Sequence, residues 1–405
     1  MARLLVRDLA QVATPSGPGA PLRGGALREV TVLEDAYVLC RGDAIEAVGR
    51  MDALPPLDGD VEELDGSGLC ALPGLVDCHT HPAWGGDRVA EFALRAAGAG
   101  YEELHAAGGG ILSTVAATRA LDGDGLAARV AEHARWMLAH GTTTWEGKSG
   151  YGLDRETELA SLRAVRAAGG SPTWLGAHAV PPEHADADAY LDFALAEVLP
   201  DAAPLADAAD VFLERGAFDA AQARRYLEAC RGAGLALRLH GDQFTESGAV
   251  PLAIELGARS VDHLEATGPD GIAALAASGV VGVLLPASAL FLDRPMPPAR
   301  SLADAGAAVA LASDFNPGSA FTTSLPLVAS LACTQLHLAP EEALAALTVN
   351  AAHVLGCASD RGRIAPGFHA DLTLLDAPDW RYLAYHLAGD VVAAVVRDGS
   401  VAFRR

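Results

Sequence analysis

In the stretch LPGLVDCHTH, residues 72–81, an apolar run ends in two histidines spaced i, i+2. On a β-strand, residues two apart point to the same face, so His79 and His81 can reach one point beyond the strand end. Imidazole is a common ligand of zinc and iron. The pair therefore predicts a metal site at the end of a buried strand, although two ordinary loop histidines would show the same spacing.

Seven more strand-like runs follow along the chain, and Ala-rich segments with helical patterns separate them. The eight runs cover residues 72–81, 142–152, 173–180, 210–218, 235–243, 258–265, 280–286 and 308–316. Among the helical segments, 156–170 and 219–234 are clear, and the second closes with a glycine that suits a helix C-terminus. Eight strands that alternate with helices predict an α/β fold, a (β/α)8 TIM-like barrel.

Polar side chains follow most of these runs. In a (β/α)8 barrel, the carboxyl ends of the strands gather the active site. Charged and imidazole groups at so many strand ends are hard to explain by packing alone, so we expect them to surround one site. They are His79, His81, Lys148, Tyr151, His178, Glu214, His240, Gln243, His263, Glu265, Asp314 and Asn316.

Each of these residues also has a structural alternative. His240 directly follows an apolar run and is favoured as a third metal ligand, but a lone histidine after a strand is more often structural. Asp314 suits a metal or proton-transfer role, and it also suits a turn or helix N-cap. His263 is either a proton-transfer or electrophilic group beside the metal, or a core histidine bonded to a neighbouring carboxylate. Each alternative stays open here.

Two cations have competing interpretations as well. Lys148 could simply pair with Glu146 or Glu158, as surface charges often do. Arg88 lies in a glycine-containing loop after the first strand, where it is either a surface residue or a clamp for a substrate carboxylate. The other histidines are expected to be structural or to face solvent: His105, His133, His140, His184, His337, His353, His369 and His386.

The two chain ends share a sequence pattern that differs from that of the barrel region. Residues 1–68 hold short strand-like runs separated by Gly/Pro/Ser turns, and residues 365–405 return to that pattern with a hairpin signal at Asp398-Gly399. We expect both ends to form one small β-sandwich-like domain. The barrel then takes residues 69–364.

Composition limits the partners. The chain of 405 residues carries 29 Lys+Arg against 52 Asp+Glu, a net charge of −23. Such a surface repels phosphates, so neither nucleic-acid nor membrane binding is expected. Its six cysteines form no CxxC pair. Because the start MARLLVRDLAQVATP also lacks a signal-peptide pattern, a cytoplasmic protein with reduced thiols is expected.

Longer strings resemble the imidazolonepropionase family, which belongs to the mononuclear metal subtype of the amidohydrolase superfamily. They cover most of residues 72–335 in the order of that family. The strings are GGDRVAEFALR (85–95), YEELHAAGGGILSTVAATR (101–119), KSGYGLDRETEL (148–159), LGAHAVPPE (175–183), HGDQFTESGA (240–249), VDHLEATG (261–268) and SDFNPGSAFTTSLPLVASLACT (313–334).

The resemblance implies hydrolysis of 4-imidazolone-5-propanoate to N-formimidoyl-L-glutamate, a step of histidine degradation, by a metal-bound hydroxide. It implies one divalent or ferric ion per chain, Zn or Fe, and a small anionic heterocyclic substrate, and it suggests a homodimer. The implied metal ligands are His79, His81, His240 and Asp314, with His263 and Asp314 catalytic. The implied substrate contacts are Arg88, Tyr101, Tyr151, His178, Gln243, Asn316, Gly318 and Ser319.

The chain departs from the family pattern at Gly147, at Ala266 and in the loop 286–292, which leaves a related cyclic amide open as the substrate. Two other functions also remain open. A related deaminase or cyclic amidase acting on an uncharged heterocycle would give Arg88 no carboxylate to bind. A catalytically inactive scaffold relative would bind no metal.

Overall fold

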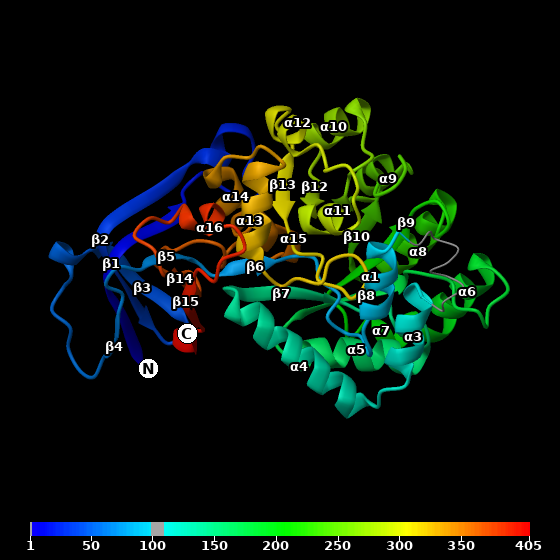
Figure 1. Cartoon of the computed structure of the whole chain (residues 1–405), viewed down its shortest axis with the longest axis horizontal. Helices are drawn as coiled ribbons and strands as arrows, with labels where there is room; N and C mark the ends of the chain where they lie inside the picture. Colours follow the sequence, from blue (N-terminus) through cyan, green and yellow to red (C-terminus); the bar gives the residue numbers. More distant parts are fainter. Residues whose placement is uncertain (1, 99–108) are drawn as a thin grey trace.

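The chain forms two eight-stranded sheets, one of them a barrel wrapped by helices. The computed structural model describes residues 2–98 and 109–405 (Figure 1). In the barrel, neighbouring strands pair parallel in sequence order. Its strands are β6 (Leu75–Asp77), β7 (Thr142–Lys148), β8 (Ser171–Ala177), β9 (Ala208–Leu213), β10 (Ala236–Gly241), β11 (Ser260–His263), β12 (Val281–Leu284) and β13 (Ala308–Leu311). The predicted (β/α)8 barrel is confirmed.

The barrel closes just beyond the ends of its first and last strands. The backbone N–H of Asp314 donates to the carbonyl of His79 over 3.1 Å, and the N–H of His81 donates to the carbonyl of Phe315 over 2.9 Å. The hydroxyl of Ser313 donates to the carboxylate of Asp77 over 2.5 Å. These bonds bring residues more than 200 positions apart in sequence together, at the edge where the site forms.

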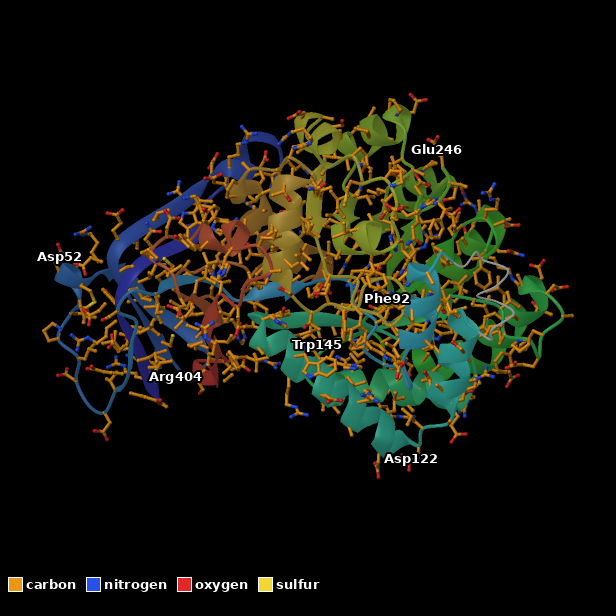
Figure 2. All side chains as sticks on the ribbon, in the orientation of Figure 1. Asp52, Phe92, Asp122, Trp145, Glu246 and Arg404 are labelled. Atoms are coloured by element: carbon orange, nitrogen blue, oxygen red, sulfur yellow. The ribbon has the colours of Figure 1, made fainter. Side chains whose placement is uncertain are left out.

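Helices connect the barrel strands and surround them. They are α1 (Val89–Ala96), α3 (Ile111–Arg119), α4 (Gly123–Ala139), α5 (Arg155–Ala167), α6 (Ala187–Phe193), α7 (Leu199–Ala202), α8 (Ala220–Gly232), α9 (Ala249–Leu256), α10 (Pro269–Ala276), α11 (Pro286–Phe291), α12 (Ala299–Asp304), α13 (Leu325–Thr334), α14 (Pro340–Ala346) and α15 (Val349–Leu355). Asp154 and Asp219 cap α5 and α8. Trp145 of β7, labelled in Figure 2, packs against the apolar faces of α4 and α5.

The second sheet joins both chain ends. It runs β16-β15-β14-β5-β1-β2-β3, with β4 paired to β1. In Figure 1 its blue N-terminal and red C-terminal strands lie side by side. The strands are β1 (Arg3–Pro15), β2 (Val30–Arg41), β3 (Ala44–Arg50), β4 (Glu62–Asp65), β5 (Cys70–Pro73), β14 (Leu372–Leu375), β15 (Val392–Arg397) and β16 (Ser400–Arg404); short helices η1 (Gly24–Arg28), η2 (Met51–Ala53), η3 (Ala194–Val198) and α16 (Tyr382–Tyr385) complete the chain.

The passage from this sheet to the barrel is abrupt. β5 pairs with β1 and β14 in the smaller sheet, and β6 begins two residues later as the first barrel strand. Only Gly74 lies between them, and a Cβ there would sit 2.2 Å from Thr143 Oγ1. Residues 70–73 thus belong to the smaller sheet by hydrogen bonding. The division at residues 68/69 and 364/365 stays a prediction.

Two further observations bear on the sequence expectations. All six cysteines are free. Within the described residues, every helix is too short or too polar to cross a bilayer.

Candidate active site

A cavity of about 700 Å³ opens at the carboxyl ends of the barrel strands. It brings together residues that the sequence predicted at six different strand ends. The predicted residues that line it are His81, Arg88, Tyr151, His178, His240, Gln243, His263, Asp314, Asn316, Gly318 and Ser319. His79 does not line the cavity and is fully buried beneath the lining residues. Tyr101 lies outside the described residues.

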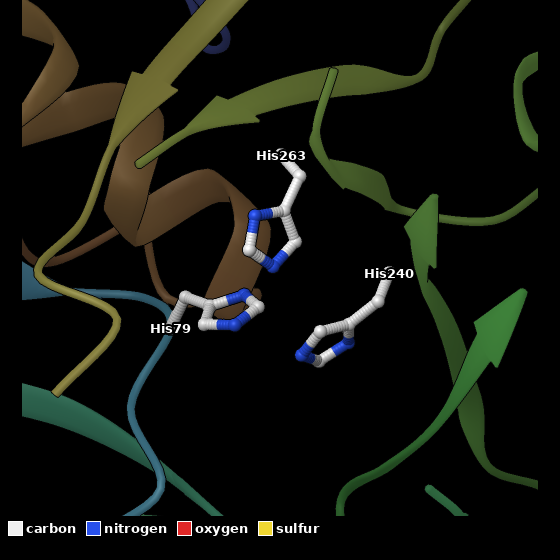
Figure 3. A group of neighbouring side chains, drawn as sticks. All are labelled: His79, His240 and His263. Carbon is white, nitrogen blue, oxygen red and sulfur yellow. The ribbon is translucent and has the colours of Figure 1, made fainter. Parts of the chain in front are cut away.

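The four predicted metal ligands are linked by close contacts between their ligand atoms. Nε2 of His81 lies 3.3 Å from Nε2 of His79 and 3.3 Å from Nε2 of His240. Asp314 Oδ1 lies 3.4 Å from Nε2 of both His79 and His81. Figure 3 shows the rings of His79, His240 and His263 turned toward one another from three separate strand ends.

These atoms fit a metal ion. Metal–ligand bonds of about 2.0–2.1 Å at tetrahedral angles put neighbouring ligand atoms about 3.3 Å apart, which is the spacing in the four contacts above. His79 Nδ1 lies 2.6 Å from a carboxylate oxygen of Asp262, so a neutral His79 donates from Nδ1 and keeps a lone pair on Nε2. His240 Nδ1 lies 3.0 Å from Asp210 Oδ2 but outside hydrogen-bond geometry, and its Nε2 is the atom that faces His81. Lone pairs that face one another at this distance call for a cation between them.

The electrostatics of the cluster keep Asp314 ionised and favour the neutral form of two of its three histidines. Burial lowers the pKa of His79, but hydrogen bonds to Asp262 and Asp314 outweigh it and raise that pKa to about 9. Burial raises the pKa of Asp314, but hydrogen bonds from His79 and His81 hold it well below the usual range. Burial also lowers the pKa of His81 and of His240. Neutral imidazoles and an ionised carboxylate are the forms that bind metals, so a metal ion bound here would displace the proton held by His79.

His263 stands beside this ligand set. Its ring centre lies 5.4 Å from that of His240 and 5.7 Å from that of His79. The backbone of His263 has φ +86°, an unusual conformation for a residue with a side chain, and it turns the chain at the end of β11. His263 Nδ1 lies 3.5 Å from Glu265 Oε1 and makes no hydrogen bond to the described residues. The catalytic assignment of His263 stays a prediction.

Arg88 lies at the rim of the cavity and is paired with a residue that the sequence analysis missed. Its Nε donates to Glu91 Oε2 over 2.9 Å, and its Nη2 contacts Glu91 Oε1. Glu91 also accepts the backbone N–H of Gly110 over 2.7 Å. The opposite edge of the guanidinium, with Nη1 beside Gly318, is the edge left for another carboxylate. The i, i+3 spacing of Arg88 and Glu91 was the available signal.

A buried carboxylate shapes the wall that carries Tyr151. Glu158 Oε1 accepts the backbone N–H groups of Gly150, Gly152 and Leu153 over 2.9–3.0 Å. The loop so held places the buried Tyr151 ring 5.3 Å from the ring of His178. Glu158 therefore does not pair with Lys148, which is one of the two partners considered for that lysine.

His178 has a defined hydrogen-bonding role. Its Nδ1 lies 2.9 Å from the carbonyl oxygen of Gly150, which can only accept, so Nδ1 carries the proton. Burial lowers the pKa of His178 to about 3, so the ring is neutral. Its Nε2 is then a hydrogen-bond acceptor beside the cavity.

Asn316 organises the loop that follows β13. Its amide donates to the carbonyl of Asp314 and to Ser319 Oγ, and its oxygen accepts the N–H groups of Gly318 and Ser319. Ser319 Oγ in turn donates to Asp314 Oδ2 over 3.2 Å. These bonds fix the orientation of Asp314. Direct substrate contacts from Asn316, Gly318 and Ser319 stay predictions.

Glu214 supports the loop that carries Gln243. Its carboxylate accepts the backbone N–H groups of Phe244 and Thr245 over 2.8 and 3.2 Å. Gln243 is 9% exposed and lines the cavity. Glu214 thus positions a neighbouring wall of the cavity, at the strand end where the sequence placed it.

Two of the three departures from the family pattern lie away from the described cavity lining. A Cβ at Gly147 would sit 2.6 Å from the methyl groups of Val165, so packing against α5 accounts for the glycine. Ala266 is absent from the lining as well. Only the end of the third departure reaches the cavity, through Leu292.

Comparison with known proteins agrees with the fold and the site. A sequence model described as "Amidohydrolase family" matches residues 91–403. Solved structures resemble the whole chain, among them a zinc-bound adenosine deaminase from Xanthomonas campestris, with a TM-score of 0.74 and 20% identity over 100% of this chain and 93% of that chain. A triazine hydrolase from Arthobacter aurescens gives a TM-score of 0.73 at 20% identity, over 100% of this chain and 95% of that one. The chain belongs to the amidohydrolase family and is a metal-dependent hydrolase.

Curated relatives narrow the family. The imidazolonepropionase of Rubrobacter xylanophilus is 60% identical over 98% of both chains. Those of Chloroflexus aggregans and Deinococcus radiodurans are 46% and 45% identical, over 98% and 99% of this chain and 98% and 100% of theirs. Within the amidohydrolases, this chain falls in the imidazolonepropionase family.

Proposed function

We propose that this protein hydrolyses 4-imidazolone-5-propanoate to N-formimidoyl-L-glutamate. The observation that carries the proposal is one cavity with a three-histidine, one-carboxylate cluster at its floor and the free edge of Arg88 at its rim. The substrate has the matching parts, a cyclic amide and a propionate carboxylate. The names of the curated relatives support the same reaction.

In this proposal, His79, His81, His240 and Asp314 would hold one metal ion. A metal ion bound there supplies Lewis-acid chemistry, which makes water a stronger nucleophile near neutral pH. Three imidazoles and one carboxylate suit zinc and iron, and metal analysis of the purified protein would choose between them.

The remaining residues bind the substrate and move protons. The Nη1/Nη2 edge of Arg88 binds the propionate with two charge-assisted hydrogen bonds, beside the hydroxyl of Tyr151. The Nε2 lone pair of His178 accepts a ring N–H, and Gln243 contacts another ring atom. Such fixed contacts hold the scissile amide above the cluster.

Proton transfer is assigned to Asp314 and His263. Asp314 accepts a proton from the attacking water and passes it to the ring nitrogen as the C–N bond breaks. His263 donates a hydrogen bond to the carbonyl oxygen, where negative charge develops. The water thus supplies the oxygen of the new carboxylate and the proton of the departing nitrogen.

Substrate turnover tests the proposal. We expect the purified protein to convert 4-imidazolone-5-propanoate to N-formimidoyl-L-glutamate, identified by mass spectrometry. The matched substrate is the same imidazolone with its carboxylate amidated, for which kcat/KM should fall at least about 100-fold. Equal turnover of the amidated compound, or faster turnover of an uncharged purine, pyrimidine or hydantoin, would contradict this function.

Three further assignments belong to the same proposal. The free cysteines support a cytoplasmic enzyme. The enzyme works as a homodimer, which sedimentation analysis would test. The proposed division has β-domain segments 1–68 and 365–405 around a barrel region 69–364, whose first strand, β5 (Cys70–Pro73), hydrogen-bonds into the smaller sheet.

A further inference from the structure

A fully buried lysine lies beneath the metal-ligand cluster. Lys148, at the end of β7, has no exposed surface. Its Nζ lies 2.6 Å from Asp210 Oδ2, 2.8 Å from Glu146 Oε2 and 3.8 Å from Asp262 Oδ2. These carboxylates come from β9, β7 and β11, and all are fully buried. One ammonium group therefore faces carboxylates from three strands.

Two of these carboxylates also contact the predicted ligands. Asp262 Oδ2 lies 2.6 Å from His79 Nδ1, and it is the same oxygen that faces Lys148. Asp210 Oδ2 lies 3.0 Å from His240 Nδ1, and it too is the oxygen that faces Lys148. Asp210 Oδ1 accepts the backbone N–H of His240 over 3.1 Å. Lys148 is thus one carboxylate away from each histidine.

The barrel backbone does not supply this link. β6, which leads to His79, pairs with β7, whereas β10, which carries His240, pairs with β9 and β11. The two histidines therefore start from strands that share no hydrogen bonds in the described sheet. A side chain that crosses the barrel interior is needed to fix one ring relative to the other. Lys148 is long enough and stands between the two carboxylates that hold those rings.

We infer that Lys148 is a positioning residue that fixes the orientations of His79 and His240 together, through Asp262 and Asp210, and so sets the affinity of the site for its metal. The inference rests on the proposed metal site. Lys148 touches neither substrate nor metal in this role. It holds two carboxylate oxygens where the Nδ1 atoms of the histidines meet them, which leaves both Nε2 atoms turned to the same point.

Charge explains why a cation is required at this position. Glu146, Asp210 and Asp262 are buried together, and burial of like charges without compensation is costly. Lys148 and the buried Arg238, which pairs with Glu146, supply the compensation. Without Lys148, Asp210 and Asp262 would repel each other across the barrel. Their oxygens would then leave the histidine Nδ1 atoms.

The test measures metal affinity on the folded protein. Zn²⁺ binding to the Lys148→Met variant is followed by competition with a chromophoric chelator, and Co²⁺ binding by its d–d absorption spectrum. We expect the Kd for Zn²⁺ to rise about 10–100-fold, within the range for groups that orient metal ligands, and the Co²⁺ spectrum to change. The matched control is Glu342→Gln, which removes a buried charge from a remote ion pair with Arg300. It should leave the Kd within twofold.

A second series separates positioning from a general structural effect. In an Asp210→Asn/Asp262→Asn background, adding Lys148→Met should change the Kd less than twofold, because the lysine acts through those carboxylates. If Lys148→Met does not fold, Lys148→Gln replaces it with the same thresholds. A Kd within twofold of the unaltered protein, or a full further loss in the double background, would overturn the inference.

Both readouts are independent of substrate. Loss of Zn²⁺ affinity in a protein that does not turn over the imidazolone would support the role of Lys148 while contradicting the proposed reaction. Normal turnover by the unaltered protein, together with an unchanged Kd in Lys148→Met, would support the proposed reaction while contradicting the role of Lys148.

Discussion

The pairing of Arg88 with Glu91 allows a prediction that separates substrate binding from stability. Arg88 uses Nε and part of Nη2 on Glu91, and it keeps the other edge for the substrate carboxylate. Arg88→Ala removes two charge-assisted hydrogen bonds to the substrate. At about 1.5–3 kcal/mol each, and taking the lower values because the two bonds form one clamp, the loss is about 3 kcal/mol, or about 100-fold in kcat/KM.

The same change leaves Glu91 without its partner. The Glu91 side chain is 9% exposed, so its unpaired charge should cost about 1–3 kcal/mol of folding stability. The double variant Arg88→Ala/Glu91→Gln removes that charge, and the amide oxygen of the new side chain can still accept the N–H of Gly110. We expect it to recover Tm but not kcat/KM. Steady-state kinetics and thermal unfolding of both variants measure the two effects.

One outcome would refute this reasoning directly. If the double variant regains most of its kcat/KM along with its Tm, Arg88 acts by maintaining the fold and not by binding the carboxylate. If kcat/KM of Arg88→Ala fell by less than about threefold, Arg88 would likewise not bind the substrate carboxylate.

Three further outcomes follow from the site and its surroundings. His79→Ala should lose both bound metal and turnover, which metal analysis and the imidazolone assay would show; full activity without metal would end the metal-hydrolase interpretation. Glu158→Ala, which leaves three buried N–H groups without their acceptor, should raise KM at least about tenfold by releasing the Tyr151 loop; an unchanged KM would contradict that role. Burial lowers the pKa of His133 to about 4, so the unfolded chain binds a proton there between about pH 6.5 and 4 that the folded protein excludes, and stability should fall as the pH drops through that window. By pH 5 the His133 effect should have lowered the free energy of unfolding by about 2 kcal/mol. Urea unfolding of His133→Gln should lack this loss, and equal pH dependence of the two proteins would refute the prediction.

Strand ends were predictable because their signals are local. An apolar run followed by a histidine or an aspartate marks both a buried strand and its polar end, and the barrel order then brings those ends together. His79, His81, His240 and Asp314 were found in this way, with the family strings to support them, and the structure brings their ligand atoms within 3.3–3.4 Å in consecutive contacts.

The partners of these residues were not predictable in the same way. Lys148 was expected to pair with Glu146 or Glu158, and the structure confirms Glu146 but adds Asp210 and Asp262 from 62 and 114 positions further along the chain. Asp262 meets His79 across 183 residues. In the sequence Asp210 begins one strand-like run and Asp262 lies inside another, and nothing there distinguishes an inward carboxylate from an outward one.

The barrel, the smaller sheet joined from both ends and the polar strand ends were predictable because strand burial and strand-end polarity are local sequence patterns. Which carboxylate contacts which histidine, and the contact of Glu91 with one edge of Arg88, are visible only in the folded chain. The structure also shows that close packing against Val165 accounts for the glycine at position 147. These facts depend on how strands far apart in the chain face one another across the barrel, where a shift of one residue turns a side chain from the interior to the helices.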